Sequence, residues 1–155
     1  MNAEMKNGIN LLMILVLFIS CVQEKEDNNV LRRVEACMEL FPDSALSLLS
    51  QIECPECMRG QQRADYALLL TQALDKNYIT ITSDSLIKKA VTYYENHNDI
   101  ASLALSYYYM GRTYFDMQDA LQAQQAYLKA LELGESLNST DLLIKINNSL
   151  GTLYS

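Results

Sequence analysis

The chain has 155 residues, with 12 basic and 19 acidic side chains and a formal net charge of −7. An acidic surface repels phosphate backbones, so this composition argues against nucleic-acid binding. The length suffices for a single domain with a hydrophobic core of ordinary size. There are ten tyrosines and no tryptophan, and tyrosine can supply contact surface because its ring is apolar and its hydroxyl can face water.

Residues 1–20 have the pattern of a secretion signal. One positive charge, Lys6, precedes Ile9–Ile19, which is apolar except for one asparagine. This run is too short to span a bilayer as a helix, which needs about 20 residues, but it suits the core of a signal peptide. It is followed by Ser20 and Cys21. A small residue directly before a cysteine resembles the lipobox of bacterial lipoproteins.

The resemblance implies that Cys21 becomes the lipidated N-terminus, since a cysteine with two or three acyl chains is a stable membrane anchor. An ordinary signal peptide followed by a chance cysteine is the alternative. Residues 21–29 then form an acidic, flexible tether, because they show no apolar period. Such acidic runs are similar to the surface-export signals of Bacteroides-group lipoproteins, which implies a place in the cell envelope, in the outer rather than the inner membrane, and surface exposure. A plain solvated linker explains the run equally well.

A short helical hairpin is predicted next, over Val30–Leu40 and Ser44–Ile52. Pro42 separates the two helices, because the residue before a proline avoids the helical region. Asp43 is expected to cap the second helix, since its carboxylate can accept a hydrogen bond from a free backbone N–H.

Cys54 and Cys57 form a lone C-x-x-C pair after this hairpin. Such a pair can be redox-active or half of a zinc site, but zinc would need two further ligands, and only His97 and Cys37 are present besides carboxylates. A thioredoxin-like site needs a strand–helix context that is not predicted here. A structural bridge or chance loop cysteines is therefore the main interpretation, because disulfides form in exported proteins. Metal or redox chemistry at this pair remains the alternative function.

Two further helices are predicted over Ala64–Asn77 and Ser83–Asn96, each with apolar residues at three- and four-residue steps. The connection Tyr78–Thr82 has the composition of a strand, but it is short and has no partner, so we expect a loop. The single histidine, His97, lies in a polar turn, where solvation is its simplest role. No nucleophile elbow, phosphate loop or H-E-x-x-H motif is present. The sequence therefore predicts neither an enzyme nor a bound cofactor.

The clearest pattern in the chain runs over Leu103–Leu137, where two helices carry facing stripes of large and small residues. These residues are Tyr107, Met110, Gly111 and Tyr114 on the first helix and Ala123, Tyr127 and Ala130 on the second. Gly111 has no side chain, so the second helix can approach the first closely at that point. Asp119 is expected to cap the second helix.

The same order returns near the end of the chain, in Asn147, Leu150, Gly151 and Tyr154. An incomplete second copy therefore begins at about residue 144. The stretch 104–137 resembles the tetratricopeptide repeat, a helix–turn–helix unit of about 34 residues. The offset from Gly111 to Gly151 is longer than this unit, which is typical of repeats with extended helices. An ordinary helical hairpin in a bundle is the alternative.

The whole of 30–155 resembles the N-terminal part of tetratricopeptide-repeat lipoproteins of the Bacteroides group. The resemblance implies an all-α fold of antiparallel helix hairpins, an α-solenoid of about seven helices, that binds protein or peptide. Some relatives continue into more repeats and a signalling region, and this segment would then be a sensory arm. A repeat cannot bury its apolar face alone, so we expect further repeats or a partner after Ser155.

In this family, ligands lie in a groove lined by the first helices of the repeats. The repeat register carries this groove onto Asp65, Leu68, Gln72, Asp75, Leu105, Tyr108, Arg112, Phe115, Lys145, Asn148 and Thr152. The two cations, Arg112 and Lys145, would suit an extended peptide with an acidic group. Some of these positions are also expected to contact only the neighbouring helix.

Overall fold

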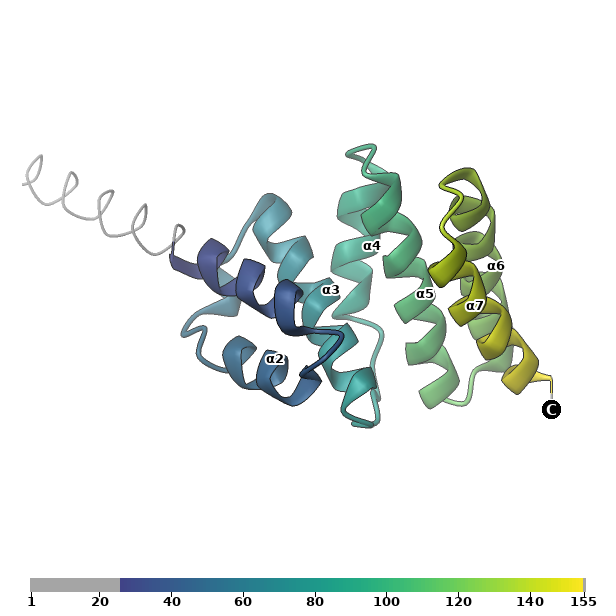
Figure 1. Ribbon diagram of the computed structural model, residues 1–155, viewed down its shortest axis with the longest axis horizontal. Helices are drawn as coiled ribbons and strands as arrows, with labels where there is room; N and C mark the ends of the chain where they lie inside the picture. Colours follow the sequence, from purple (N-terminus) through teal and green to yellow (C-terminus); the bar gives the residue numbers. More distant parts are fainter. Residues whose placement is uncertain (1–25, 155) are drawn as a thin grey trace, which may run out of the picture.

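A computed structural model of the chain describes residues 26–154, and this part is entirely helical (Figure 1). It has seven α-helices and one 3-10 turn, with no β-strand between residues 26 and 154. Residues 26–37 belong to the first helix. The others are α2 (Pro42–Leu49), α3 (Gly60–Lys76), α4 (Ile87–Glu95), α5 (Ile100–Asp116), α6 (Ala120–Ser136) and α7 (Thr140–Leu153), with the turn η1 (Pro55–Cys57) before α3. The all-α prediction is confirmed.

The predicted signal peptide, Cys21 and residues 21–25 of the tether lie outside the described residues. Residues 26–29, which the sequence assigns to the tether, are helical, so that prediction is wrong at this end. Asp27 is 7% exposed, so this part of the chain already packs against its neighbours. No helix in the described part is long and apolar enough to cross a membrane.

The helices follow one another in a row, from the N-terminal pair at one end to α6 and α7 at the other (Figure 1). From α2 onward each helix packs on the next in sequence, and α3 also contacts α5, which in turn contacts α7. Helices α3, α5 and α7 begin at equal intervals along the chain, at Gly60, Ile100 and Thr140. This interval equals the offset between Gly111 and Gly151 in the two copies of the sequence pattern.

The ends of the helices repeat as regularly as their starts. Four non-glycine residues with positive φ, each just beyond a helix C-terminus, recur at equal intervals along the chain: Tyr78, Asn98, Gln118 and Asn138. A left-handed residue at this position lets the last carbonyls of a helix find donors. At the end of α5, for example, the N–H of Asp119 donates to the Tyr114 carbonyl at 2.9 Å.

Asp119 then begins the next helix, as predicted, because its carboxylate accepts a hydrogen bond from the N–H of Gln122 at 3.1 Å. The equivalent prediction for Asp43 is wrong. Helix α2 starts two residues earlier than predicted, at Pro42, and its N-cap is Phe41 with no side-chain cap. Proline suits the first helical position because it lacks the N–H that would be unsatisfied there, so Asp43 lies inside the first turn.

The predicted close approach between α5 and α6 is present at Gly111. A Cβ atom on Gly111 would lie 2.4 Å from the Cδ1 and Cε1 atoms of the Tyr127 ring, so no other residue fits without displacing that ring. Ala123, Tyr127 and Ala130 are all 0% exposed. The facing stripes of the sequence pattern therefore form the centre of the main core.

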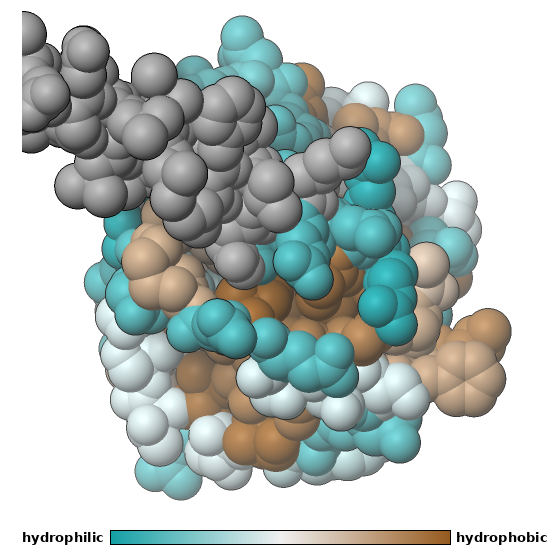
Figure 2. All heavy atoms as spheres, turned by 90° about the vertical axis from the view of Figure 1, so that its left-hand side faces the viewer, coloured by the Kyte–Doolittle hydropathy of each residue, from teal (hydrophilic) through white to brown (hydrophobic). Residues whose placement is uncertain are grey.

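Helix α3 takes part in two hydrophobic cores. Its Ala67 and Leu68 belong to the main core with α4 to α7, while Leu69 and Ala73 pack on the N-terminal hairpin. Hydrophobic side chains also show in the middle of the face at the N-terminal end, framed by hydrophilic ones (Figure 2). The hairpin is thus attached to the repeats through α3, which starts at Gly60 and not at the predicted Ala64.

Candidate peptide-binding cleft

A cleft with a volume of about 1020 Å³ lies between the first helix, α3 and the start of α5. The first helix contributes Leu31 and Glu35, and the turn after it contributes Met38 and Glu39. Four residues of the predicted groove line this cleft: Asp65, Leu68, Gln72 and Leu105. The family register did not predict that the N-terminal helix would form the opposite wall.

Three carboxylates lie near one another in the cleft, whose lining also includes Arg32 and Arg59. Asp65, Glu35 and Asp99 all line it, and Asp65 accepts a hydrogen bond from the hydroxyl of Tyr94. Burial, reinforced by the negative charges of Glu35 and Asp99, raises the pKa of Asp65 although the Tyr94 hydrogen bond opposes the shift. Asp99 is also the N-cap of α5, where its carboxylate accepts from the N–H of Ser102 at 3.0 Å.

Farther along α3 and α5, Asp75 and Arg112 form an ion pair with 2.7 Å between Oδ1 and Nε. The side chains of Arg112 and Asp75 are only 28% and 13% exposed, and the guanidinium lies 5.7 Å from the centroid of the Phe115 ring. Tyr108 is 8% exposed and packs edge-on against Tyr109. These predicted groove residues are therefore largely engaged in packing between the protein's own helices.

The predicted groove residues on α7 lie apart from the cleft lining. Asn148 and Thr152 are exposed, and the Thr152 hydroxyl donates to the Asn148 carbonyl at 3.0 Å. Lys145 pairs with the turn after the first helix, where its Nζ lies 3.3 Å from Oε1 of Glu39. The groove prediction thus divides into a cleft-lining group, a packed group and an exposed group on α7.

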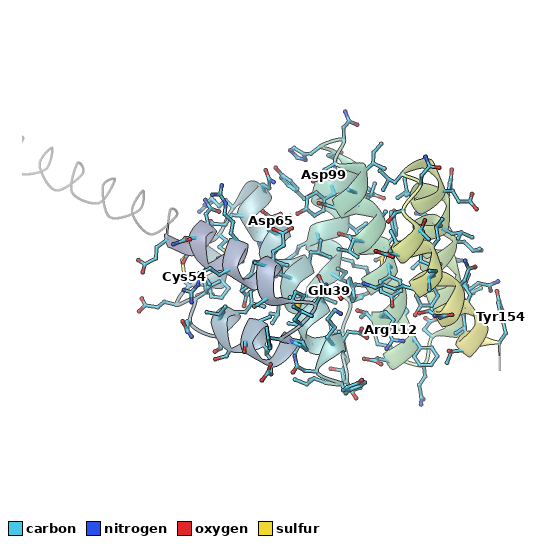
Figure 3. All side chains as sticks on the ribbon, viewed as in Figure 1. Glu39, Cys54, Asp65, Asp99, Arg112 and Tyr154 are labelled. Carbon is cyan, nitrogen blue, oxygen red and sulfur yellow. A yellow bond between two sulfur atoms is a disulfide. The ribbon has the colours of Figure 1, made fainter. Side chains whose placement is uncertain are left out.

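Two residues that the sequence did not suggest, Glu39 and Lys76, connect these groups. The Glu39 carboxylate accepts from Lys76 Nζ at 2.8 Å and from Gln72 Nε2 at 3.4 Å, in addition to Lys145. The hydrogen bond from Lys76 is the main reason that the pKa of Glu39 is lowered. Figure 3 shows Glu39 near the centre of the molecule, between Asp65 and Arg112.

A sequence signal existed for Lys76 but not for Glu39. Gln72 and Lys76 are four residues apart on α3, so they share a face of that helix, and a search along that face would have found the lysine. Glu39 comes from another element and meets Lys145 across 106 residues of chain. Ion pairs exposed to this degree contribute only about 0.2–1 kcal/mol each.

Cys54 and Cys57 form a disulfide in the connection between α2 and α3. Together with Glu56 they place three metal-binding atoms within 4.8 Å of one another. Cysteine binds metals as the thiolate, so the disulfide form cannot supply that ligand pair. The third described cysteine, Cys37, is free and half-buried against the N-terminal core.

Comparison of the chain with family models, with curated proteins and with solved structures finds no match.

Proposed function

We propose that the chain is a helical-repeat module of the tetratricopeptide type that binds an extended segment of another protein and catalyses no reaction. The cleft between the first helix, α3 and α5 is the observation that supports this proposal. Two of its walls, α3 and α5, begin one repeat interval apart, at Gly60 and Ile100, so the cleft crosses from one repeat to the next.

The chemistry of the cleft suggests the kind of peptide that it would take. Leu68 and Leu105 offer an apolar floor for one side chain, and Asp65 with its acidic neighbours would attract a basic group. Glu39 also lines the cleft, and the two lysines that pair with it, Lys76 and Lys145, would suit an acidic group of the peptide. A segment that is basic at one end and acidic at the other is therefore the preferred ligand class.

Site-specific photo-crosslinking tests this proposal. A photoreactive residue in place of Glu35, which lines the cleft, is expected to capture a defined partner. The same residue in place of Glu132, an exposed position on α6, serves as the control. Capture from position 35 alone, with loss of the product in Lys145→Glu, is the expected result. Equal capture from both positions would remove the support for the cleft.

The place of action that we propose is the cell envelope, with the chain anchored through a lipid on Cys21 and exposed from the outer membrane. The lipobox-like sequence before Cys21 supports this proposal. Cys21→Ser is expected to move the protein from the membrane fraction to the soluble fraction, which fractionation and immunoblotting would measure. A wild-type protein that is already in the soluble fraction would favour the ordinary signal peptide.

Metal or redox chemistry at Cys54 and Cys57 is the alternative, and the proximity of Glu56 is the observation that favours it. Zinc binding by the reduced protein, abolished by Cys54→Ser, would support it. An unaltered partner crosslink in the double variant Cys54→Ser/Cys57→Ser, with no zinc bound by the reduced wild type, would leave the disulfide a purely structural role.

A further inference from the structure

Three donors from two helices converge on one carboxylate at the edge of the cleft. Gln72 and Lys76 approach Glu39 from α3, and Lys145 approaches it from α7. Both carboxylate oxygens are engaged, Oε2 by Lys76 and Oε1 by Gln72 and Lys145. The arrangement is that of an anion site with a carboxylate already bound, and the bound group belongs to the protein itself.

The ion pairs of Glu39 differ from a buried structural ion pair in their exposure to solvent. The Glu39 side chain is 59% exposed, and exposed ion pairs add little to stability because solvent competes for both charges. The Asp75–Arg112 pair is different, since Asp75 is 13% exposed and lies on the rigid helix α3. Of the three cations in these ion pairs, the two lysines are therefore the ones whose partner can be exchanged.

The backbone around Glu39 allows such an exchange without unfolding. Met38 is 2% exposed in the N-terminal core, and the N–H of Phe41 donates to the Cys37 carbonyl at 2.8 Å, which closes the turn. The main chain on both sides of Glu39 is thus fixed. Rotation about the side-chain bonds of Glu39 is enough to move its carboxylate into solvent and to leave Gln72, Lys76 and Lys145 free to bind another anion.

We propose that Glu39 occupies the place of a ligand carboxylate, so that an acidic group of the bound peptide displaces it on binding. The inference rests on the proposed function, because it assigns the acidic end of the peptide to this site. It also gives the site a regulatory property. The apparent affinity for the ligand is lowered by the fraction of molecules in which Glu39 is bound, and removal of the Glu39 charge should raise that affinity.

Titration of the ¹⁵N-labelled protein with small carboxylates, followed by NMR, tests the proposal. The acidic group of the peptide can be a side-chain carboxylate or the C-terminal carboxylate. N-acetylglutamate α-amide carries only the first and N-acetylglutamine only the second, so the two probes distinguish them. N-acetylglutamine α-amide is the neutral control. The signals to follow are the side-chain amide of Gln72 and the backbone amides around Lys76 and Lys145.

In Glu39→Gln, at least one of the charged probes should shift these signals at roughly fivefold lower concentration than in the wild type. The double variant Glu39→Gln/Lys145→Gln should lose the response. Glu53→Gln, which removes the same charge from an exposed position in the loop after α2, should behave as the wild type does. Equal titration of Glu39→Gln and wild type, or no response in Glu39→Gln, would overturn the proposal.

The two proposals can fail separately. A partner crosslinked from position 35, together with no anion binding in Glu39→Gln, would keep the cleft as a peptide site and reject the role of Glu39. Anion binding in Glu39→Gln without any crosslinked partner would keep the anion site and reject the proposed function.

Discussion

Helices α5 and α7 carry the same order of residues, but among the described residues only α5 has a side chain packed against its glycine. Gly111 on α5 faces the ring of Tyr127, whereas a Cβ on Gly151 of α7 would meet no heavy atom within 4 Å in the described residues. Tyr154, which corresponds to the buried Tyr114, is 65% exposed. The sequence pattern thus specifies where a neighbouring helix would pack, and a small residue is a packing device only where that helix is present.

The difference extends to how the two helices are held. Helix α5 lies between α4 and α6 and also contacts α3 and α7, while α7 contacts only α6 and α5 in the described part. Leu142 and Ile146 bury one face of α7, and Ile144 on another face is 54% exposed. An ion pair between Lys145 and Glu39 connects α7 with the turn of the N-terminal hairpin.

The largest effect is expected from Tyr127→Ala, because the ring is 0% exposed and fills the space beside Gly111. The free energy of unfolding, measured with urea, should fall by about 3–5 kcal/mol. The matched control is Tyr127→Phe. The Tyr127 hydroxyl is buried and makes no hydrogen bond of ordinary geometry among the described residues, although Ser149 lies close enough to influence its pKa. Its removal should therefore change stability by about 1 kcal/mol or less. Equal costs for the two variants would show that the ring does not hold the hairpin together.

Gly111→Ala is expected to lower the free energy of unfolding nearly as much as Tyr127→Ala does, because the new methyl group would lie 2.4 Å from two atoms of the Tyr127 ring. Overpacking of this kind should lower the free energy of unfolding by about 3 kcal/mol. The same substitution in a Tyr127→Ala background should cost much less, since the clashing ring is gone and the two sites are coupled. Additive costs in this double-mutant cycle would contradict the close approach.

A smaller effect is expected when protonation of Glu39 removes its ion pair with Lys145 on α7. The pKa of Glu39 is lowered from its ordinary value of 4.5, chiefly by the hydrogen bond from Lys76. The stabilisation by this ion pair is therefore fully present above pH 4.5, and it is lost as the pH falls through the lower pKa of Glu39 in the folded state. After correction for intrinsic rates, amide hydrogen exchange in α7 should accelerate by about twofold at acidic pH.

Helix α5 is the internal control for this measurement, because no comparable exposed tie to the hairpin holds it among the described residues. In Glu39→Gln the acceleration in α7 should disappear, since the substituted side chain does not titrate. An identical pH profile of α7 in wild type and variant would show that Glu39 does not stabilise this helix.

The packing of the hairpin could be predicted from sequence because its determinants are local. Gly111, Ala123 and Tyr127 lie on helix faces that the three- and four-residue steps reveal, and Asp119 precedes its helix in the usual manner of an N-cap. Among the left-handed residues, Asn98 and Asn138 are of a type that tolerates this conformation. Gln118 and Tyr78 are not, and the repeat geometry imposes it on them.

The candidate site was less predictable because its parts come from distant segments. The register includes Asp65, Leu68, Gln72 and Leu105, which line the cleft, since they share one face of the first helices. It could not reveal that the predicted helix over Val30–Leu40 would form the opposite wall, nor that Glu39 would contact a lysine 106 residues away. Tyr108 matched the groove register, but the core of the hairpin buries it to 8% exposure.

The most direct test of the contrast between the hairpin and α7 is the same substitution at both glycines, compared in urea unfolding. Gly151→Ala adds a methyl group where no heavy atom lies within 4 Å, so helix propensity alone should raise the free energy of unfolding by about 0.5–1 kcal/mol. We expect opposite signs: Gly151→Ala stabilises the protein and Gly111→Ala destabilises it. If both substitutions destabilise the protein to a similar extent, then α7 has a neighbour at Gly151 and the contrast is wrong.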